Sequence, residues 1–304
     1  MLAGVLLLLA APAYGASQQD HDSCVNGTGD SLAACTRIID DRSESVHNRA
    51  MAYTNRGLDW ETSGNVERAL ADYSEAIRLD PKGAMAYNNR GRAWLDKKSD
   101  PDRAIADFNE AIQLNPKFAL AINNRGLAWY RKRDYDRAIA DFSEAIRLDP
   151  APKADVQINV YYNRGLAWNC KRDTDRAIAD FTEAIRVNPR HFWSFNRRCL
   201  ARAISGRELP SALADCDEAL RLKPDFVNAM ENRGFVHLRL GRLNDAITDY
   251  DAALKIDPKR AYALYGRGFA KQKKGDATAG DADITAAKAI QSDIAEEFAR
   301  QGVK

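Results

Sequence analysis

One pattern of about 34 residues recurs along most of this 304-residue chain, and residues 86–116 (AYNNRGRAWLDKKSDPDRAIADFNEAIQLNP) are typical of it. Aligned on the small residue that follows Asn-Arg, seven copies stand 34, 35, 39, 33, 36 and 34 residues apart. In the first six copies an Ala is followed twelve residues later by Pro, so insertions fall outside this interval. A repeat of this length predicts a small unit that buries its apolar face by stacking on its neighbours. The aligned residues are Gly57, Gly91, Gly126, Gly165, Arg198 (the exception), Gly234 and Gly268.

Each copy divides into two helices, called helix A and helix B below. Helix A carries the aligned Gly, and helix B carries the Ala. Helix B starts after a capping residue such as Asn65 or Asp100 and ends before Pro, which cannot continue a helix. The small residues let the paired helices approach closely. The pattern therefore predicts an all-α chain of stacked helix pairs.

Composition limits the classes of partner. The chain is 45% apolar and 29% charged, and its 45 Lys and Arg nearly balance its 43 Asp and Glu. This balance gives no electrostatic reason to expect nucleic acid as a partner, and no internal segment reads as a membrane span. The four His show no HExxH spacing, and neither a Gly-x-Ser-x-Gly motif nor a phosphate-binding lysine loop occurs. We therefore expect no enzyme activity, no cofactor and no metal site.

The repeated residues resemble the tetratricopeptide repeat family. Its motif of aromatic, Gly, aromatic, Ala, aromatic and Pro stands here as Tyr53, Gly57, Trp60, Ala69, Tyr73 and Pro81. The resemblance covers residues 48–292 and implies an α-α superhelix, or solenoid, of about seven helix-turn-helix repeats. Residues 16–47 are interpreted as an N-terminal capping segment and residues 293–304 as a C-terminal capping helix. The fifth copy departs from the motif at Arg198, Ala201 and Cys216, and the seventh at Gly280, Ile284 and Ser292.

The N-terminus predicts export. Residues 1–15, MLAGVLLLLAAPAYG, combine a leucine-rich run with small residues placed like those before a signal-peptidase cut at Ala16. The run carries no Lys or Arg at its start, as though it were part of a longer signal, and a plain apolar helix is the alternative. The mature chain is expected in the periplasm or the secreted space.

Every copy also carries a matched pair of charged residues. An Arg precedes the aligned small residue, and an Asp follows the repeat Ala by three positions. A half-buried Arg needs a partner, so we expect the two side chains to pair within the fold. A row of ligand-binding arginines is the alternative. The arginines are Arg56, Arg90, Arg125, Arg164, Arg197, Arg233 and Arg267, and the aspartates are Asp72, Asp107, Asp141, Asp180, Asp215, Asp249 and Asp283.

The resemblance implies that helix A lines a concave face that receives peptide segments. Asparagines recur there, and a row of primary amides can hold an extended peptide backbone, although packing or solvation is the alternative reading. Aromatic residues gather in the second half of the array, where they mark a contact site or pack on the next helix. Met51, Met85 and Leu120 stand where the family's carboxylate clamp has lysines, so that clamp is absent. The candidate peptide-binding residues are Asn55, Asn88, Asn89, Asn123, Asn124, Asn163, Asn196, Asn232, Phe195, Phe235 and Tyr265.

Export makes disulfides possible for the five cysteines. Cys24 and Cys35 lie eleven residues apart across a Gly-containing turn, and Cys199 and Cys216 lie on the two helices of the fifth copy. We predict these two disulfides, with Cys170 left over. Cys170 could instead lie near Cys199, and buried free thiols are a further alternative.

These observations predict a non-catalytic scaffold that binds proteins or peptides. A self-assembling structural component of the cell envelope is the alternative. The sequence does not determine the oligomeric state.

Overall fold

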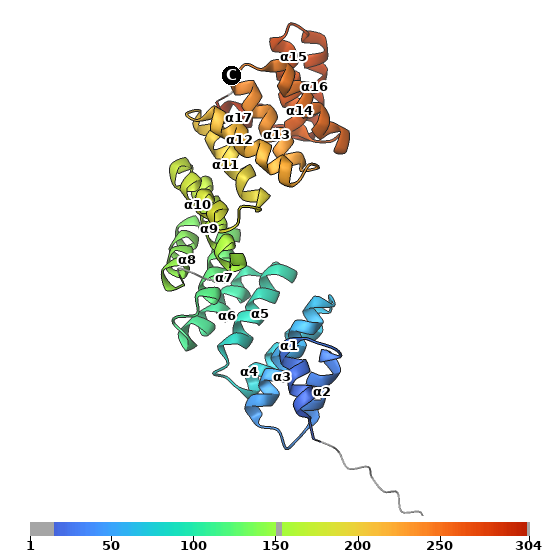
Figure 1. Cartoon of the computed structure of the whole chain (residues 1–304), viewed down its shortest axis with the longest axis vertical. Coiled ribbons are helices and arrows are strands. Elements are labelled where there is room, and N and C mark those ends of the chain that lie inside the picture. The colour runs from blue at the N-terminus through green and yellow to red at the C-terminus, as the bar shows by residue number, and fades with distance from the viewer. Residues whose placement is uncertain (1–14, 150–153, 303–304) are drawn as a thin grey trace, which may run out of the picture. The chain divides into compact units, whose positions relative to one another are not determined.

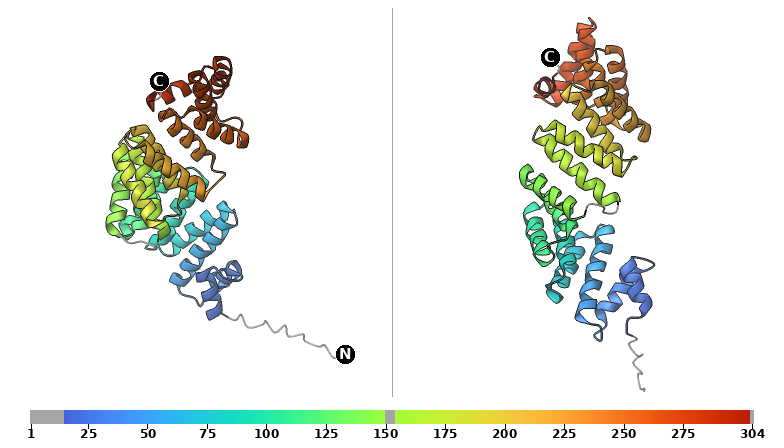
Figure 2. Two further views of the ribbon diagram at one scale, coloured as in Figure 1. Left: turned by 45° about the horizontal axis from the view of Figure 1, so that its top comes forward. Right: turned by 60° about the vertical axis from the view of Figure 1, so that its left-hand side comes forward.

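The computed structural model describes residues 15–149 and 154–302, and these residues form seventeen α-helices and no strand (Figures 1 and 2). The chain divides into two compact units, with the boundary between Asp134 and Tyr135. Unit 1 comprises α1 (Gln18–Asn26), α2 (Ser31–Asp40), α3 (Val46–Thr62), α4 (Val66–Leu79), α5 (Ala84–Lys97), α6 (Pro101–Leu114) and α7 (Ala119–Arg131). Unit 2 comprises α8 (Tyr135–Leu148), α9 (Ala154–Cys170), α10 (Thr174–Val187), α11 (Phe192–Ser205), α12 (Leu209–Leu222), α13 (Val227–Arg239), α14 (Leu243–Ile256), α15 (Ala261–Lys273), α16 (Ala277–Ile290) and α17 (Ile294–Arg300).

Within each unit, consecutive helices pack against one another as antiparallel pairs, which confirms the predicted all-α repeat architecture. Odd-numbered helices from α3 to α15 are the A helices. Four neighbouring pairs of them contact each other directly: α3 and α5, α5 and α7, α11 and α13, and α13 and α15. The predicted caps are present: the Asn65, Asp100, Asp173 and Asp276 side chains each accept a hydrogen bond from a backbone N–H in the first turn of helix B. Of the predicted export signal, residues 1–14 lie outside the described residues.

In several repeats the aligned Gly lies in close contact with the helix B aromatic. A Cβ at Gly91 would lie 2.8 Å from the Phe108 ring, and one at Gly57 would lie 2.5 Å from the Tyr73 ring. Both rings are fully buried. Any side chain at this position would therefore push the ring away, which explains why Gly recurs here.

The Arg–Asp pairs form inside the repeats. Arg90 makes two parallel hydrogen bonds to Asp107, of 2.9 Å from Nε and 2.8 Å from Nη2, and its Nη1 donates to Ser74 on the preceding helix B. The same arrangement joins Arg56 to Asp72, Arg164 to Asp180, Arg233 to Asp249 and Arg267 to Asp283. The Asp107 carboxylate raises the pKa of Arg90 above its ordinary value. These arginines join two successive repeats and serve the structure in this way.

The fifth repeat corrects the predicted alignment by one residue. Arg198, not Arg197, makes the bidentate pair with Asp215, at 2.9 and 2.6 Å. Cys199 therefore occupies the place of the aligned Gly, and the spacings around it become 34 and 35 residues in place of 33 and 36. Cys216, directly after Asp215, occupies the place of the helix B aromatic. The pair Asn196-Arg197 is followed here by a second Arg, so alignment on Asn-Arg puts Arg198 at the Gly position.

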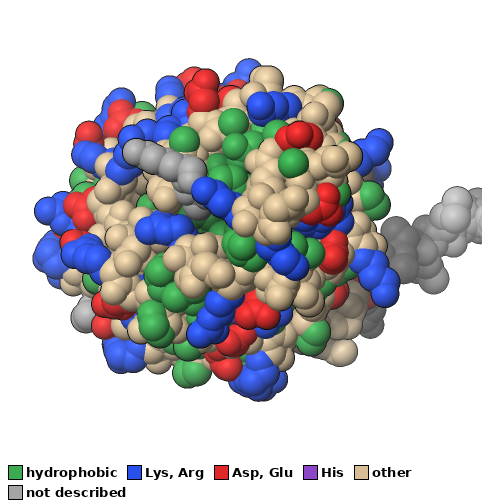
Figure 3. Space-filling view, turned by 90° about the horizontal axis from the view of Figure 1, so that it is seen from above, with side chains coloured by type: hydrophobic (Ala, Val, Ile, Leu, Met, Phe, Trp, Pro, Cys, Tyr) green, Lys and Arg blue, Asp and Glu red, His purple; other side chains and the backbone are tan. Residues whose placement is uncertain are grey.

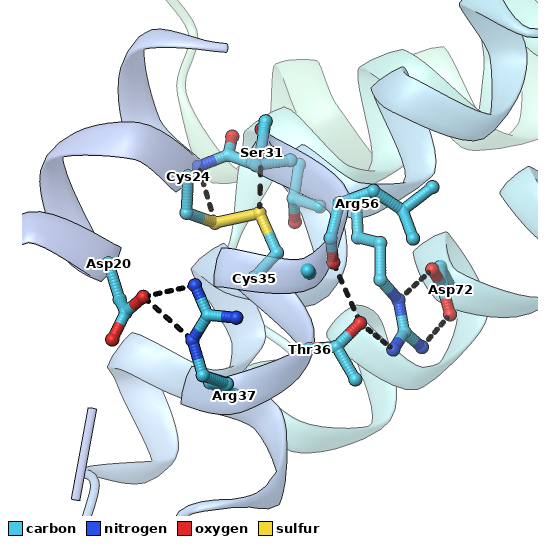
Figure 4. Close-up of a disulfide and its surroundings, with 12 residues drawn as sticks. Asp20, Cys24, Ser31, Cys35, Thr36, Arg37, Arg56 and Asp72 are labelled. Carbon is cyan, nitrogen blue, oxygen red and sulfur yellow. Dashed lines mark hydrogen bonds and ion pairs between the residues drawn. A yellow bond between two sulfur atoms is a disulfide. The ribbon is translucent and has the colours of Figure 1, made fainter. Parts of the chain in front are cut away.

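Two buried disulfides are present, between Cys24 and Cys35 and between Cys199 and Cys216, with Cα–Cα distances of 4.9 and 5.5 Å. Figure 4 shows the first one joining α1 to α2, beside the ion pair in which Arg37 Nε donates to Asp20 at 2.8 Å. The second replaces the contact with an aromatic ring that Gly57, Gly91, Gly165 and Gly234 make in their repeats. Cys170 is exposed.

At the other end of the chain, α17 folds back onto the A helices α13 and α15. Ile294 and Phe298 are its buried anchors, with 0% and 1% of their surfaces exposed. Arg239 of α13 fixes the end of the helix, because its Nη1 donates to the backbone oxygens of Gln301 and Ala203, both at 3.0 Å. The chain's own C-terminal segment therefore covers part of the helix A face in unit 2.

Candidate binding surface

The predicted asparagine row is largely buried. Asn88, Asn89, Asn123, Asn196 and Asn232 are at most 8% exposed, whereas Asn55, Asn124 and Asn163 are half-buried. For these five residues the burial favours packing over contact with a peptide, the two readings that the sequence left open.

Several of these amides bond to each other across successive A helices. Asn124 Nδ2 donates to Asn88 Oδ1 at 3.0 Å, and Asn232 Nδ2 donates to Asn196 Oδ1 at 2.8 Å. Within α5, Asn88 Nδ2 donates to Asn89 Oδ1 at 3.2 Å. A buried amide needs such partners, so the row stabilises the stacking of the repeats. A role in peptide binding stays a prediction for Asn55, Asn124 and Asn163.

The predicted aromatic surface of unit 2 is covered as well. Phe235 is fully buried and meets Phe298 of α17 edge to face, with ring centroids 6.0 Å apart. Tyr262 and Tyr265 lie against the same Phe298 ring at 4.5 and 4.7 Å, and the Tyr262 hydroxyl donates to Gln301 Oε1 at 2.7 Å. These aromatics form a cage for the chain's own helix, so Phe235 packs within the fold, which is the second of the two readings given for the aromatic residues.

Phe195 has a structural explanation in the corrected alignment. It stands four residues before Cys199, as Tyr87 stands four before Gly91. Arg198 lies 5.8 Å from the centre of the Phe195 ring, the same distance that separates Arg90 from the Tyr87 ring. Phe195 is therefore the ordinary first aromatic of the repeat, and it is half-buried.

Unit 1 leaves an open apolar hollow on its helix A face. A cavity of about 390 Å³ lies between α1, α3 and α5. Three large apolar residues at its edge are exposed: Val25 by 58%, Met51 by 44% and Met85 by 52%. The remaining lining residues are His47, Ala50, Thr54, Asn55, Ala76, Asp80, Gly83, Ala84 and Ala86.

Polar contacts at this hollow are few. His47 Nδ1 lies 3.2 Å from Asp80 Oδ2, and Asp80 Oδ1 accepts a hydrogen bond from the Lys82 backbone N–H at 3.0 Å. Leu120 continues the row of exposed apolar residues on α7, with 36% of its surface exposed. In the sequence, Met51, Met85 and Leu120 argued against a lysine clamp. Their shared position on three successive A helices was the signal for an apolar surface.

Comparisons with known proteins agree with the repeat geometry. One family model, described as TPR repeat, matches residues 62–98 and 238–275, and another, described as Tetratricopeptide repeat, matches residues 95–152. The matched segments, residues 62–152 and 238–275, carry tetratricopeptide repeats. Such repeats form a non-catalytic scaffold, and binding of proteins or peptides is typical of them.

Solved tetratricopeptide structures share the fold at low sequence identity. The YrrB protein, described as having an unusual peptide-binding site, is 21% identical over 64% of this chain and 97% of its own, with a TM-score of 0.54. PilW, a type IV pilus biogenesis factor, is 18% identical over 70% of this chain and 96% of its own, with a TM-score of 0.63. A tetratricopeptide repeat protein from Parabacteroides merdae is 16% identical over 83% of this chain and 98% of its own, with a TM-score of 0.61. No curated protein matches the sequence.

Within residues 15–149 and 154–302, no group of three or more His, Cys, Asp and Glu side chains could hold a metal ion, and no helix is long and apolar enough to cross a membrane. Figure 3 shows Lys and Arg side chains mixed with Asp and Glu on the face that it presents, with apolar side chains between them. Among the surfaces described here, the hollow of unit 1 combines open space with exposed apolar side chains.

Proposed function

We propose that this protein is an exported scaffold that binds a peptide segment of a partner protein on the helix A face of unit 1. The observation that carries the proposal is the row of exposed Met51, Met85 and Leu120 on α3, α5 and α7, next to the open hollow. Exposed apolar residues gathered in this way mark interaction sites, because contact with water is unfavourable for them. In unit 2, by contrast, α17 covers the corresponding aromatic residues.

The two disulfides support the proposed location. Disulfides persist in oxidising compartments such as the periplasm and the secreted space. All four bonded sulfurs belong to residues that are at most 3% exposed, so the bonds are part of the packed core. Together with the apolar run of residues 1–15, they favour export, with Ala16 as the first residue of the mature chain.

Site-specific cross-linking tests the binding surface. A photoreactive phenylalanine analogue is placed at Met85 or, as a matched control, at Ile256, which is exposed to 51% against 52% for Met85. Cross-links to a different protein in intact cells should form from position 85 and not from position 256. Equal yields from both positions would refute the proposal, and cross-links only to a second copy of the chain would favour the self-assembling alternative. N-terminal sequencing of the same purified protein checks the predicted cut before Ala16.

A further inference from the structure

We propose that the hollow between α1, α3 and α5 receives an apolar side chain of a partner peptide that also carries Lys or Arg close to that side chain. The inference rests on the proposed function, since it names the class of segment that the scaffold binds. A protein segment fits because the hollow is lined largely by Ala and Met side chains, which favour an apolar side chain as occupant.

The lining explains the preference for an apolar anchor. Ala50, Ala76, Ala84 and Ala86 form small walls that leave the space of about 390 Å³ open, and the exposed Met51 and Met85 side chains stand at its edge. Methionine is flexible and polarisable, so it adapts to apolar side chains of different shape. An anchor such as Phe, Leu or Met would remove these exposed side chains from water.

The net charge of the capping segment, which contributes Val25 to the hollow, selects the flanking residues. The capping segment, residues 16–47, carries six acidic and two basic side chains, of which Asp20 and Arg37 pair with each other. Asp80 adds a carboxylate in the wall of the hollow itself, where His47 Nδ1 lies 3.2 Å from it. An excess of negative charge favours a partner with positive charge next to its anchor, because complementary potentials speed association and exclude acidic competitors. A basic and apolar segment therefore fits this site better than an acidic one.

The Cys24–Cys35 disulfide positions one wall of the hollow. Val25 follows Cys24 directly on α1, a helix of nine residues that is too short to be stable alone. The disulfide and the Asp20–Arg37 ion pair hold α1 on α2, as Figure 4 shows. Asn55, another lining residue, brings its Nδ2 to 4.0 Å from Cys24 Sγ. The complete hollow therefore belongs to the oxidised form of the capping segment.

Three synthetic peptides of twelve residues test the inference on the full mature chain. The first carries a central Phe-Leu pair flanked by four Lys, the second carries the same pair flanked by four Glu, and the third carries Ala-Ala between four Lys. Each has a fluorescent label, and fluorescence anisotropy gives its dissociation constant. The first peptide should bind at least tenfold more tightly than either of the others. Equal binding of the Glu peptide, or no binding of the first peptide, would overturn the inference.

Two matched double variants locate the binding. Met51→Ser with Met85→Ser removes apolar surface at the hollow, and Ile256→Ser with Ile290→Ser removes residues of similar exposure elsewhere. The first double variant should weaken the Phe-Leu-Lys peptide at least tenfold, and the second should leave its affinity unchanged. Helicity by circular dichroism shows that both variants are folded. If the Met variant binds as well as the wild type, the peptide does not use this hollow. The broader scaffold function has its own test, which is the cross-linking at position 85.

The disulfide provides a further readout. A Cys24→Ser and Cys35→Ser variant keeps Val25 but loses the bond that holds α1. We expect weaker binding of the Phe-Leu-Lys peptide with the helix content nearly retained. Unchanged affinity in this variant would show that α1 does not form a wall of the binding site.

Discussion

We expect a Gly and a Phe at positions 199 and 216 to stabilise the fifth repeat in place of the Cys199–Cys216 disulfide. In the double Cys→Ser variant at these positions, the loop of 17 residues is no longer closed. The chain-entropy model assigns a loop of this size about 3 kcal/mol, so the free energy of unfolding should fall by about that amount.

Cys199→Gly with Cys216→Phe should recover most of this loss. Cys199 and Cys216 occupy the places that Gly91 and Phe108 hold in the second repeat, and Phe108 is fully buried there. Burial of a Phe ring contributes about 3 kcal/mol or more relative to a small residue, and a Gly inside a helix costs about 1 kcal/mol. The Gly/Phe variant should therefore be about 2 kcal/mol more stable than the double Ser variant.

Urea unfolding in oxidising buffer, followed by circular dichroism, measures all three proteins with the Cys24–Cys35 bond intact. The reciprocal variant, Gly91→Cys with Phe108→Cys, serves as a control because it should form a new disulfide that blocks alkylation of both thiols. A Gly/Phe variant no more stable than the Ser/Ser variant would refute the assignment of Cys199 to the Gly position.

Three further predictions follow from single contacts. Arg90→Leu should lower the free energy of unfolding by about 3 kcal/mol, because the buried Asp107 loses its partner, whereas the double change to Leu at both positions should be less destabilising; urea titration of each variant compares them. Phe298→Ala should lower the free energy of unfolding by about 3–5 kcal/mol and expose the aromatic residues that surround Phe298. A hydrophobic dye should then fluoresce more strongly with this variant than with the wild type, and unchanged fluorescence would contradict the cage. Hydrogen bonds from Arg37 and Ser17 hold the pKa of Asp20 below its ordinary value. The stabilisation that these bonds give is therefore complete above about pH 4 and is lost as the pH falls further. In Asp20→Asn, the free energy of unfolding should fall less steeply between pH 5 and about pH 2 than in the wild type.

The repeat itself could be read from the sequence because its signals are local or periodic. The capping Asp100, the Pro101 that follows it and the spacing from Ala104 to Pro116 define helix B without knowledge of its neighbours. The Arg–Asp pair was predictable for a similar reason, since both residues recur at fixed offsets within one repeat. The two disulfides also join residues within one capping segment or one repeat.

The sequence left open whether the Asn and aromatic residues bind a partner or pack, because their exposure depends on distant segments. Asn124 and its partner Asn88 lie 36 residues apart, and only the stacking of α5 on α7 brings their amides together. Phe235 appeared to be a surface aromatic because α17, more than 60 residues later in the chain, is what buries it. The residues next to Asn88 or Phe235 in the sequence do not indicate that these side chains are buried.

The sequence by itself determined the helices, their pairing and the stacking of like units, because period, caps and small residues act within about 34 residues. The tertiary structure decided which part of the helix A face is open to a partner. In unit 1 the A helices leave Met51 and Met85 exposed beside a hollow, and in unit 2 the last helix covers the aromatics. The reason is physical: helix formation follows from local backbone and capping energies, whereas exposure to solvent is a property of the whole packed arrangement.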